Sequence, residues 1–444
     1  MGSFSPVCTI PPANAGLVSS PNVRSTVDII WSCLSVILIC TWAALHPPVP
    51  IEMTKPPSDE RNQMGWTQRT RHCFLRKFYN SFIKSYWFAF SVTAPEILTT
   101  LEVMGYIAAK HDEKQFKELA EKDGVDWSLA HSLFANMGGF AIKFKDPPQS
   151  STPDQGGHHE RSFYENAKAL RGNIWVLDGL QLKYAREAGV IKKLPSISNS
   201  QFKEKGGGDT VKTILAVFQL LWFTAQLLFR AIRGLSVTLL EISTFAFIVF
   251  SITTYLASWS KPQSVSNHVY IDADCLPTTE NIRELAKLGP MALWFERGVL
   301  WVGGDSAYFR EGRSTFKVVI VISATTSAVF SAIHLIAWDF PFPTVQERWA
   351  WRIVCLVLSV GSIPGGLLKL VQLHLQKRQF RTTKEGNQIW MGRVVVLFHI
   401  CAFLIFSTAG MARCFIFVES VRSLWFLPSD AFQATPLWNV PHVG

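Results

Sequence analysis

Glutamates inside apolar, helix-forming sequence are the residues of this chain best suited to chemistry. Glu96 follows Pro95 in the run Thr93–Ile97, and Glu102 lies six residues further along. A proline removes a backbone donor and frees a carbonyl, to which a nearby carboxylic acid could hydrogen-bond. A carboxyl buried there could keep its proton near neutral pH and act as a general acid. The other interpretation is structural, with Glu96 capping a helix or pairing with Arg or Lys at the membrane interface.

A second group of ionisable residues surrounds the loop after residue 333. His334 and Trp338 are four residues apart and share a helix face, and Asp339 ends that helix. Three further charged side chains open the next helix: Glu347, Arg348 and Arg352. One interpretation is a helical hairpin held by ion pairs. The other is an acid–base or ligand site walled by Trp and Phe.

Glu241 is a third ionisable residue in apolar surroundings. It lies about one turn inside its segment, where it could snorkel to the interface or pair with Arg233.

Cofactor signatures are missing from the sequence. The glycine-rich loops of ATP and dinucleotide binding do not occur, and the apolar segments hold too few histidines for a diiron or b-type haem site. The sequence therefore predicts no cofactor and no metal.

The elements that must position these residues are membrane-spanning helices. Of the 444 residues, 48% are hydrophobic and only 17% are charged, and the mean hydropathy is +0.18. Apolar stretches recur at about 20 residues, the length that a helix needs to cross the hydrocarbon, and many have tryptophan at their ends. We expect six spans: Val27–Leu45, Val211–Arg230, Ser236–Trp259, Lys317–Trp338, Trp351–Gln372 and Arg393–Arg413.

A seventh apolar stretch, Tyr86–Ala109, is harder to place because Pro95, Glu96 and Glu102 would be costly against lipid. Lys and Arg are concentrated in three connections, and six spans with both termini outside the cytosol place all three inside. We therefore predict an all-α, polytopic membrane helix bundle of about six spans, in which 85–109 is re-entrant or interfacial. The alternative is that 85–109 forms a seventh span.

The predicted spans divide the chain into parts with different surroundings. These are a non-cytosolic tail (1–26), the first span (27–45), a basic cytosolic segment (46–84), the segment 85–109, a cytosolic insert (110–209), a hairpin of spans (211–259), a cytosolic connection (260–316), three spans (317–413) and an interfacial tail (414–444). The net charge of +10 is grouped in the connections, which favours topology and contact with anionic lipid over nucleic acid. The first helix has no cleavable signal and the chain has no N-glycosylation sequon, which favours an intracellular endomembrane such as the endoplasmic reticulum.

An ordered set of short motifs resembles a large family of fungal multi-pass membrane proteins. The first apolar segment contributes Asp28–Cys33, Thr41-Trp42 and His46-Pro47. The remaining motifs follow in order: Ala94–Glu96, Met137–Phe140, Gln219–Phe223, Ile333–Trp338, Phe342–Arg352 and Glu419–Pro428. The resemblance runs from about residue 24 to the end of the chain. Asp339 departs from it, since many relatives have a small polar residue after the tryptophan.

Among such proteins, the chain resembles the membrane-bound terpene cyclases of ascofuranone-type meroterpenoid pathways in fungal secondary metabolism. That resemblance implies a cofactor-independent isomerase that cyclises the epoxidised prenyl chain of a phenolic substrate. Epoxide opening needs a protonated carboxyl in an apolar site, and the resulting cation needs aromatic faces and exclusion of water. The implied site has Glu96, Asp339 and Glu102 as acids, His334 as an orienting or proton-accepting group, and Trp31, Trp222 and Trp338 as substrate-binding walls.

Two other functions fit the sequence. The chain could be a transporter or receptor for a small lipophilic metabolite, or a membrane scaffold whose insert at 110–209 recruits soluble enzymes. The partners predicted are the lipid bilayer, a lipophilic small molecule and other membrane-bound enzymes of the same pathway. Nucleic acid is not among them.

Overall fold

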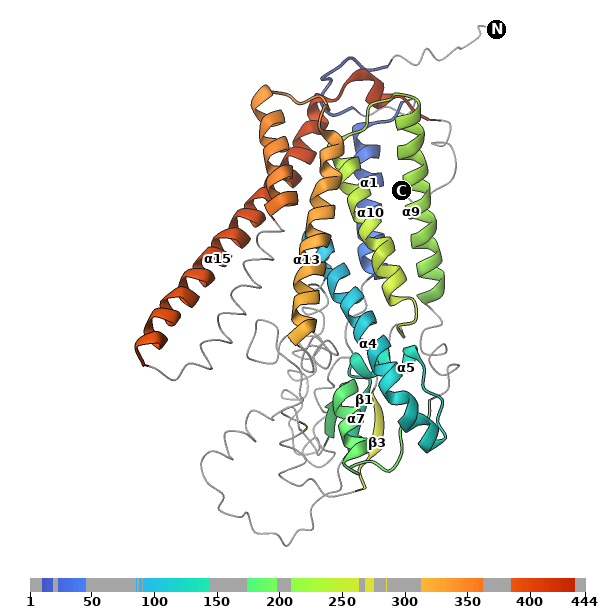
Figure 1. Ribbon diagram of the computed structural model, residues 1–444. Helices are drawn as coiled ribbons and strands as arrows, with labels where there is room; N and C mark the ends of the chain where they lie inside the picture. Colours follow the sequence, from blue (N-terminus) through green and yellow to red (C-terminus); the bar gives the residue numbers. More distant parts are fainter. Residues whose placement is uncertain are drawn as a thin grey trace, which may run out of the picture.

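The computed structural model has two parts, a bundle of long helices and a smaller α/β unit at one end of it (Figure 1). It describes residues 10–18, 23–44, 85, 88–89, 91–143, 174–197, 209–262, 268–274, 285, 313–361 and 385–435. Helix α4 (Pro95–Asp123) begins in the bundle and runs into the smaller unit. We call this smaller unit, which comprises the second half of α4 and the described residues of 124–197 and 268–285, the lower unit.

Four helices in the described part of the chain are long and apolar enough to cross a membrane, judged by length and composition. They cover Thr26–Ala44, Ile214–Ile232, Leu239–Ser258 and Ile320–Ala337. They belong to α1 (Thr26–Ala44), α9 (Asp209–Ile232), α10 (Leu239–Ser258) and α13 (Arg313–Ile333), which continues as the 3-10 turn η1 (His334–Ala337). These match the first four spans predicted from the sequence.

Helix α10 is the central helix of the bundle. In its apolar window 61% of residues are buried, against 22–39% in the other three windows. It begins with a capping box in which Thr238 and Glu241 exchange hydrogen bonds, and the Tyr255 hydroxyl ties it to the Cys40 carbonyl of α1 at 3.1 Å. The outer helices turn large apolar side chains away from the protein, among them Phe218, Leu221 and Leu228 of α9, each more than half exposed. Such a continuous apolar exterior suits lipid rather than water.

Of the other two predicted spans, one lies partly outside the described residues and the other lies inside a longer helix. A helix over 345–361 covers the first half of Trp351–Gln372. Arg393–Arg413 falls within the 38-residue helix α15 (Glu385–Arg422), whose C-terminal end meets the bundle and whose N-terminal half slants away from it (Figure 1). Two short turns, η2 (Ser423–Phe426) and η3 (Ser429–Phe432), follow α15. The helical backbone therefore continues nine residues past Arg413 into the predicted tail at 414–444, because the apolar run ends before the helix does.

No backbone break marks the predicted boundary between residues 109 and 110, because α4 continues without interruption from Pro95 to Asp123. The backbone breaks before this helix instead: residues 91–93 are helical, Ala94 is not, and Pro95 takes the first helical position. Proline suits that position because it has no N–H to leave unpaired there. Pro95 thus starts a new helix after a break in the backbone.

The lower unit contains the feature that an all-α prediction overlooks, a three-stranded sheet. Strand β1 (Phe140–Lys143) pairs antiparallel with β2 (Ile174–Leu177) and parallel with β3 (Val269–Asp272). Helices α5 (Leu129–Asn136) and α7 (Gly179–Glu187) share a core with it that includes Phe116, Phe134 and Leu182. Because β3 comes from the predicted connection 260–316, a described part of that connection packs in one unit with the described part of the insert 110–209.

Charged residues at the opposite end of the bundle join both ends of the described chain. Arg24 forms an ion pair with Glu241, which corrects the expected pairing of Glu241 with Arg233. The fully buried Arg230 donates hydrogen bonds to the carbonyls of Ser236, Asp430, Ala431 and Gln433. We call Arg24, Arg230 and Glu241 the terminal clamp, because it holds the residues before α1 and after α15 against α10.

Candidate functional site

Glu96 is the predicted acid that the structure buries most deeply. It is 1% exposed in the first turn of α4, and its Oε1 lies 2.5 Å from the Arg413 guanidinium of α15. Arg413 also donates to the Thr93 carbonyl at 3.3 Å, just before the helix break. Its guanidinium lies over the Phe330 ring of α13, 5.4 Å from the ring centre. The structural interpretation made from the sequence, a pairing with Arg or Lys, is what the structure shows.

The second carboxylate oxygen of Glu96 is the exceptional atom of this site. Glu96 Oε2 is buried and has no hydrogen-bond partner among the described residues. An unpaired polar atom in an apolar interior costs on the order of 1–3 kcal/mol, and more if it carries charge. A ligand that donates a hydrogen bond to this oxygen would remove that cost.

The position of Glu96 is fixed by hydroxyl contacts along α4. Thr99 lies 2.8 Å from the Thr254 hydroxyl of α10, and Thr100 lies 2.8 Å from the Thr326 hydroxyl of α13. Consecutive residues therefore hold α4 against two different helices. As a result, the side of α4 that carries Glu96 and Thr100 faces α13 and α15.

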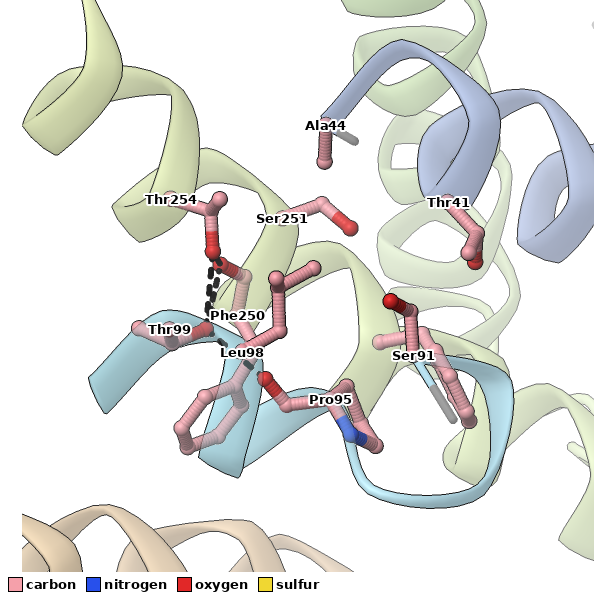
Figure 2. A pocket seen from close by; sticks show the side chains of 10 residues that line it. Thr41, Ala44, Ser91, Pro95, Leu98, Thr99, Phe250, Ser251 and Thr254 are labelled. Carbon is pink, nitrogen blue, oxygen red and sulfur yellow. Dashed lines mark hydrogen bonds between the residues drawn. The ribbon is translucent and has the colours of Figure 1, made fainter. Parts of the chain in front are cut away.

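The other side of α4 borders a small hollow between α1 and α10. Five hydroxyl side chains line it together with Pro95 and Leu98: Thr41, Ser91, Thr99, Ser251 and Thr254. Figure 2 shows Ser91 and Ser251 turning their hydroxyl groups toward the space between the helices. The hollow has room for about one water molecule, so it could hydrate the helix break but could not hold a prenyl chain.

Glu102, the second predicted acid, is also paired. Its two carboxylate oxygens each lie 2.9 Å from the Lys261 ammonium, which follows the end of α10. Both side chains are largely buried. The pair ties α4 to α10 where α4 leaves the bundle, and both oxygens of Glu102 are occupied.

The loop after η1 is held by ion pairs, and the pair that involves Asp339 lies at the surface. The Asp339 carboxylate is 88% exposed and lies 3.0 Å from Arg352, whose guanidinium stacks on Trp338 and Trp349. Glu347 pairs with Arg422. These contacts follow the simpler expectation for this loop, a hairpin held by charges, and they leave Asp339 outside any apolar site.

His334 is buried at the centre of an aromatic group. Its Nδ1 lies 2.9 Å from the Phe330 carbonyl, one turn earlier in the same helix. Its ring centre lies 5.1 Å from that of Phe330 and 6.0 Å from that of Trp351, whose indole N–H donates to the His334 carbonyl. Phe330 contacts both His334 and Arg413, so its ring alone connects His334 to the Glu96–Arg413 pair.

The three predicted tryptophan walls do not surround Glu96. Trp31 on α1 is 58% exposed and Trp338 is 36% exposed, so both face outward. Trp222, on α9, is half-buried. The aromatic residue beside the Glu96–Arg413 pair is Phe330, which packs edge-on against Phe247 and Phe250. Indoles at helix ends are typical of a membrane interface, and that placement accounts for Trp338, which follows η1, better than a site does.

The residue that sequence reasoning missed is Arg413. It served there only to mark the end of a predicted span, although an arginine at the edge of an apolar helix is a natural partner for a carboxylate at similar depth. Pairing it with Glu96 needed a contact across more than 300 residues. Among the described residues, no group of three His, Cys, Asp or Glu side chains lies close enough together to hold a metal ion.

Comparison with known proteins gives one match. A family described as "Family of unknown function (DUF8562)" matches residues 5–282, which is more than half of the 444 residues. Glu96, Glu102, Trp31 and Trp222 lie inside the matched region, whereas Arg413, His334 and Asp339 lie beyond it. No curated protein and no solved structure matches the chain.

Proposed function

The chain belongs to a family of unknown function, DUF8562, and from its geometry we propose that it is a multi-pass membrane protein that binds a small lipophilic molecule at the Glu96–Arg413 pair. The observation that carries this proposal is the buried Glu96 Oε2, which has no hydrogen-bond donor among the described residues. Every other predicted acid has its oxygens paired or exposed to solvent.

The membrane assignment rests on the helices that build the bundle. Four apolar helices of sufficient length and an apolar exterior support insertion in a bilayer. We propose six spans, with 85–109 re-entrant, the lower unit in the cytosol and both termini on the other side, in an endomembrane such as the endoplasmic reticulum. The basic residues of the connections support this orientation.

The ligand class follows from what the Glu96 site lacks. Oε2 needs a donor, so the ligand carries a hydroxyl, as a phenol does. The Phe330 ring and its neighbours Phe247 and Phe250 offer apolar contact for a hydrocarbon chain. A prenylated phenol combines both features and can reach the site from the lipid. Binding would require helices to move apart, since the hollow beside α4 holds only about one water molecule.

A second candidate function is cyclisation of an epoxidised prenyl chain on such a phenol. The observation that favours it is the Phe330 ring, which already supports a cationic guanidinium and could support a carbocation in the same way. Glu96 would have to take up a proton and donate it to the epoxide oxygen as the C–O bond breaks. That step requires Glu96 to give up its ion pair with Arg413, so the geometry favours binding over catalysis.

One experiment with full-length protein in lipid nanodiscs separates these functions. Binding of a prenylated phenol and of its epoxide would be followed by thermal shift, and conversion of the epoxide by chromatography for an isomer of unchanged mass. We expect wild type to bind and Glu96→Gln to bind at least tenfold more weakly, because the amide offers a poorer acceptor. Asp339→Asn is the matched control and should bind like wild type.

The outcomes distinguish the candidates clearly. Binding without an isomer supports a receptor or transporter, whereas an isomer that depends on Glu96 but not on Asp339 supports a cyclase. Equal binding by wild type and Glu96→Gln would overturn the proposed site. No binding of any prenylated phenol would overturn the ligand class.

A further inference from the structure

A second buried carboxyl of the bundle also has an oxygen without a hydrogen-bond donor among the described residues. Glu419 of α15 is 2% exposed, and its Oε1 is buried with no partner in the part of the chain that the structure describes. Its Oε2 is 3.9 Å from the nearest Arg422 nitrogen. That distance allows electrostatic attraction but is too long for a hydrogen bond.

The neighbours of Glu419 give this place a net negative charge. The same Arg422 nitrogen pairs directly with Glu347 Oε1. The other Glu347 oxygen accepts from the Thr344 N–H at 3.2 Å. Glu347 is therefore the better satisfied of the two carboxylates, and one guanidinium serves both. If both carboxyls were ionised, the group of three side chains would carry a charge of −1.

A buried carboxylate that has no donor and stands beside a second carboxylate is costly, and a bound proton removes that cost. A metal cation suits the place less well. It would need several more oxygen ligands, and it would be repelled by Arg422. We propose that Glu419 is a proton-binding site, in which the carboxylate takes up one proton and becomes a neutral acid beside the Glu347–Arg422 ion pair.

The location gives this proton a structural consequence. Ser420, the next residue of α15, lies 3.1 Å from the Ser243 hydroxyl of α10. Ile416, one turn earlier, packs in a cluster with Trp351 and Leu239. Glu419 thus lies where α15, α10 and the helix over 345–361 meet. Loss of its proton would place a second negative charge at this junction and weaken the contact among the three helices.

Infrared spectroscopy of the full chain in nanodiscs, titrated with base, tests the proposal directly. A protonated carboxyl absorbs at a C=O frequency that ionised carboxylates lack. We expect wild type to show this band at neutral pH and to lose it at higher pH. Glu419→Gln, which copies the neutral form, should lack the band while keeping wild-type thermal stability at neutral pH.

Glu347→Gln is the matched control. It should keep the Glu419 band but lose it at lower pH than wild type, because the neighbouring negative charge that favours the proton is gone. The proposal is overturned if the neutral-pH spectra of wild type and Glu419→Gln are the same. It is also overturned if Glu347→Gln abolishes the band and Glu419→Gln does not. If Glu419→Gln does not fold, the shift in Glu347→Gln decides the question.

Discussion

Glu241 and Glu96 are both buried glutamates at the start of a helix in the bundle, and both are ion-paired with arginine, yet their surroundings differ. Glu241 pairs with Arg24 and also accepts hydrogen bonds from the Thr238 N–H and hydroxyl, at 2.8 and 3.0 Å. Both of its oxygens are occupied. Glu96 pairs with Arg413 through one oxygen, and the other has no donor among the described residues.

This difference shows how a structural charge can be told from one that is available to a ligand. The terminal clamp around Glu241 uses nearly all its hydrogen-bonding capacity inside the protein, and it joins segments that lie at opposite ends of the chain. The Glu96–Arg413 pair leaves an acceptor unused at a break in the backbone. Glu241 and Glu96 are both buried and ion-paired, so the property that distinguishes them is whether the second carboxylate oxygen accepts a hydrogen bond.

The largest effect should come from breaking the clamp. Arg24→Met leaves Glu241 buried without its main partner, and we expect a loss of about 3–5 kcal/mol in the free energy of unfolding. The measurement is unfolding of the protein in detergent micelles, followed by tryptophan fluorescence. Arg233→Met is the matched control, because Arg233 is an exposed arginine in the loop before α10, the helix that carries Glu241, and it should change stability by less than about 0.5 kcal/mol.

Removing both charges sharpens the same comparison. Arg24→Met combined with Glu241→Gln leaves no unpaired buried charge, so it should recover at least half of the stability lost in the single variant. A double variant as unstable as Arg24→Met alone would mean that packing, and not charge, holds the termini in place.

Two groups of the lower unit, His131 and the Asp123–Arg186 ion pair, should lose their contributions to stability in two separate stages as the pH falls. Burial lowers the pKa of His131, which accepts from the Ser128 N–H at Nδ1 and lies 2.8 Å from the Ile197 carbonyl at Nε2. Hydrogen bonds from Arg186 lower the pKa of Asp123. Both groups bind protons more readily when unfolded, so their stabilisation is present at neutral pH and is lost as pH falls.

The two stages have different pH windows. The contribution of His131 should decline as pH falls below its ordinary value of 6.5, and that of Asp123 should decline below 3.8. Hydrogen exchange of α5 and α7 amides as a function of pH measures both stages. Asp123→Asn should cost about 2–3 kcal/mol at neutral pH and remove the second stage. Glu187→Gln, at a half-exposed pair with Lys183, should leave both stages intact.

The sequence predicts the elements of the bundle better than their partners. The predicted span Val27–Leu45 agrees with α1 (Thr26–Ala44) to within one residue at each end, because a span is defined by local length and apolarity. The sheet was missed because its strands have four residues each, and β1 pairs with β3 across more than 120 residues. The Arg413 partner of Glu96 was missed for the same reason. Pairing is a property of the fold, whereas the ionisable residue at apolar depth is visible in the sequence.

The stability of Glu96→Gln tests whether the Glu96–Arg413 pair is less structural than the clamp. The amide still accepts from Arg413, which also keeps its contacts with the Thr93 carbonyl and the Phe330 ring. We expect a loss of about 1–2 kcal/mol, well below that of Arg24→Met in the same assay. A loss of equal size would place Glu96 among the structural charges and remove the basis for a binding site there.

The smallest effect should come from Asp339→Asn, because that carboxylate is 88% exposed although it pairs with Arg352. Solvent screens such pairs, so the expected change in stability is below about 1 kcal/mol, and it should shrink further in high salt. Arg352 stays in place through its stacking on Trp338 and Trp349. Asp339→Asn could instead destabilise the protein as much as Glu96→Gln does. In that case the exposed fraction of Asp339 does not indicate how strongly the Asp339–Arg352 pair contributes to stability, and lipid headgroups must be protecting this pair from water.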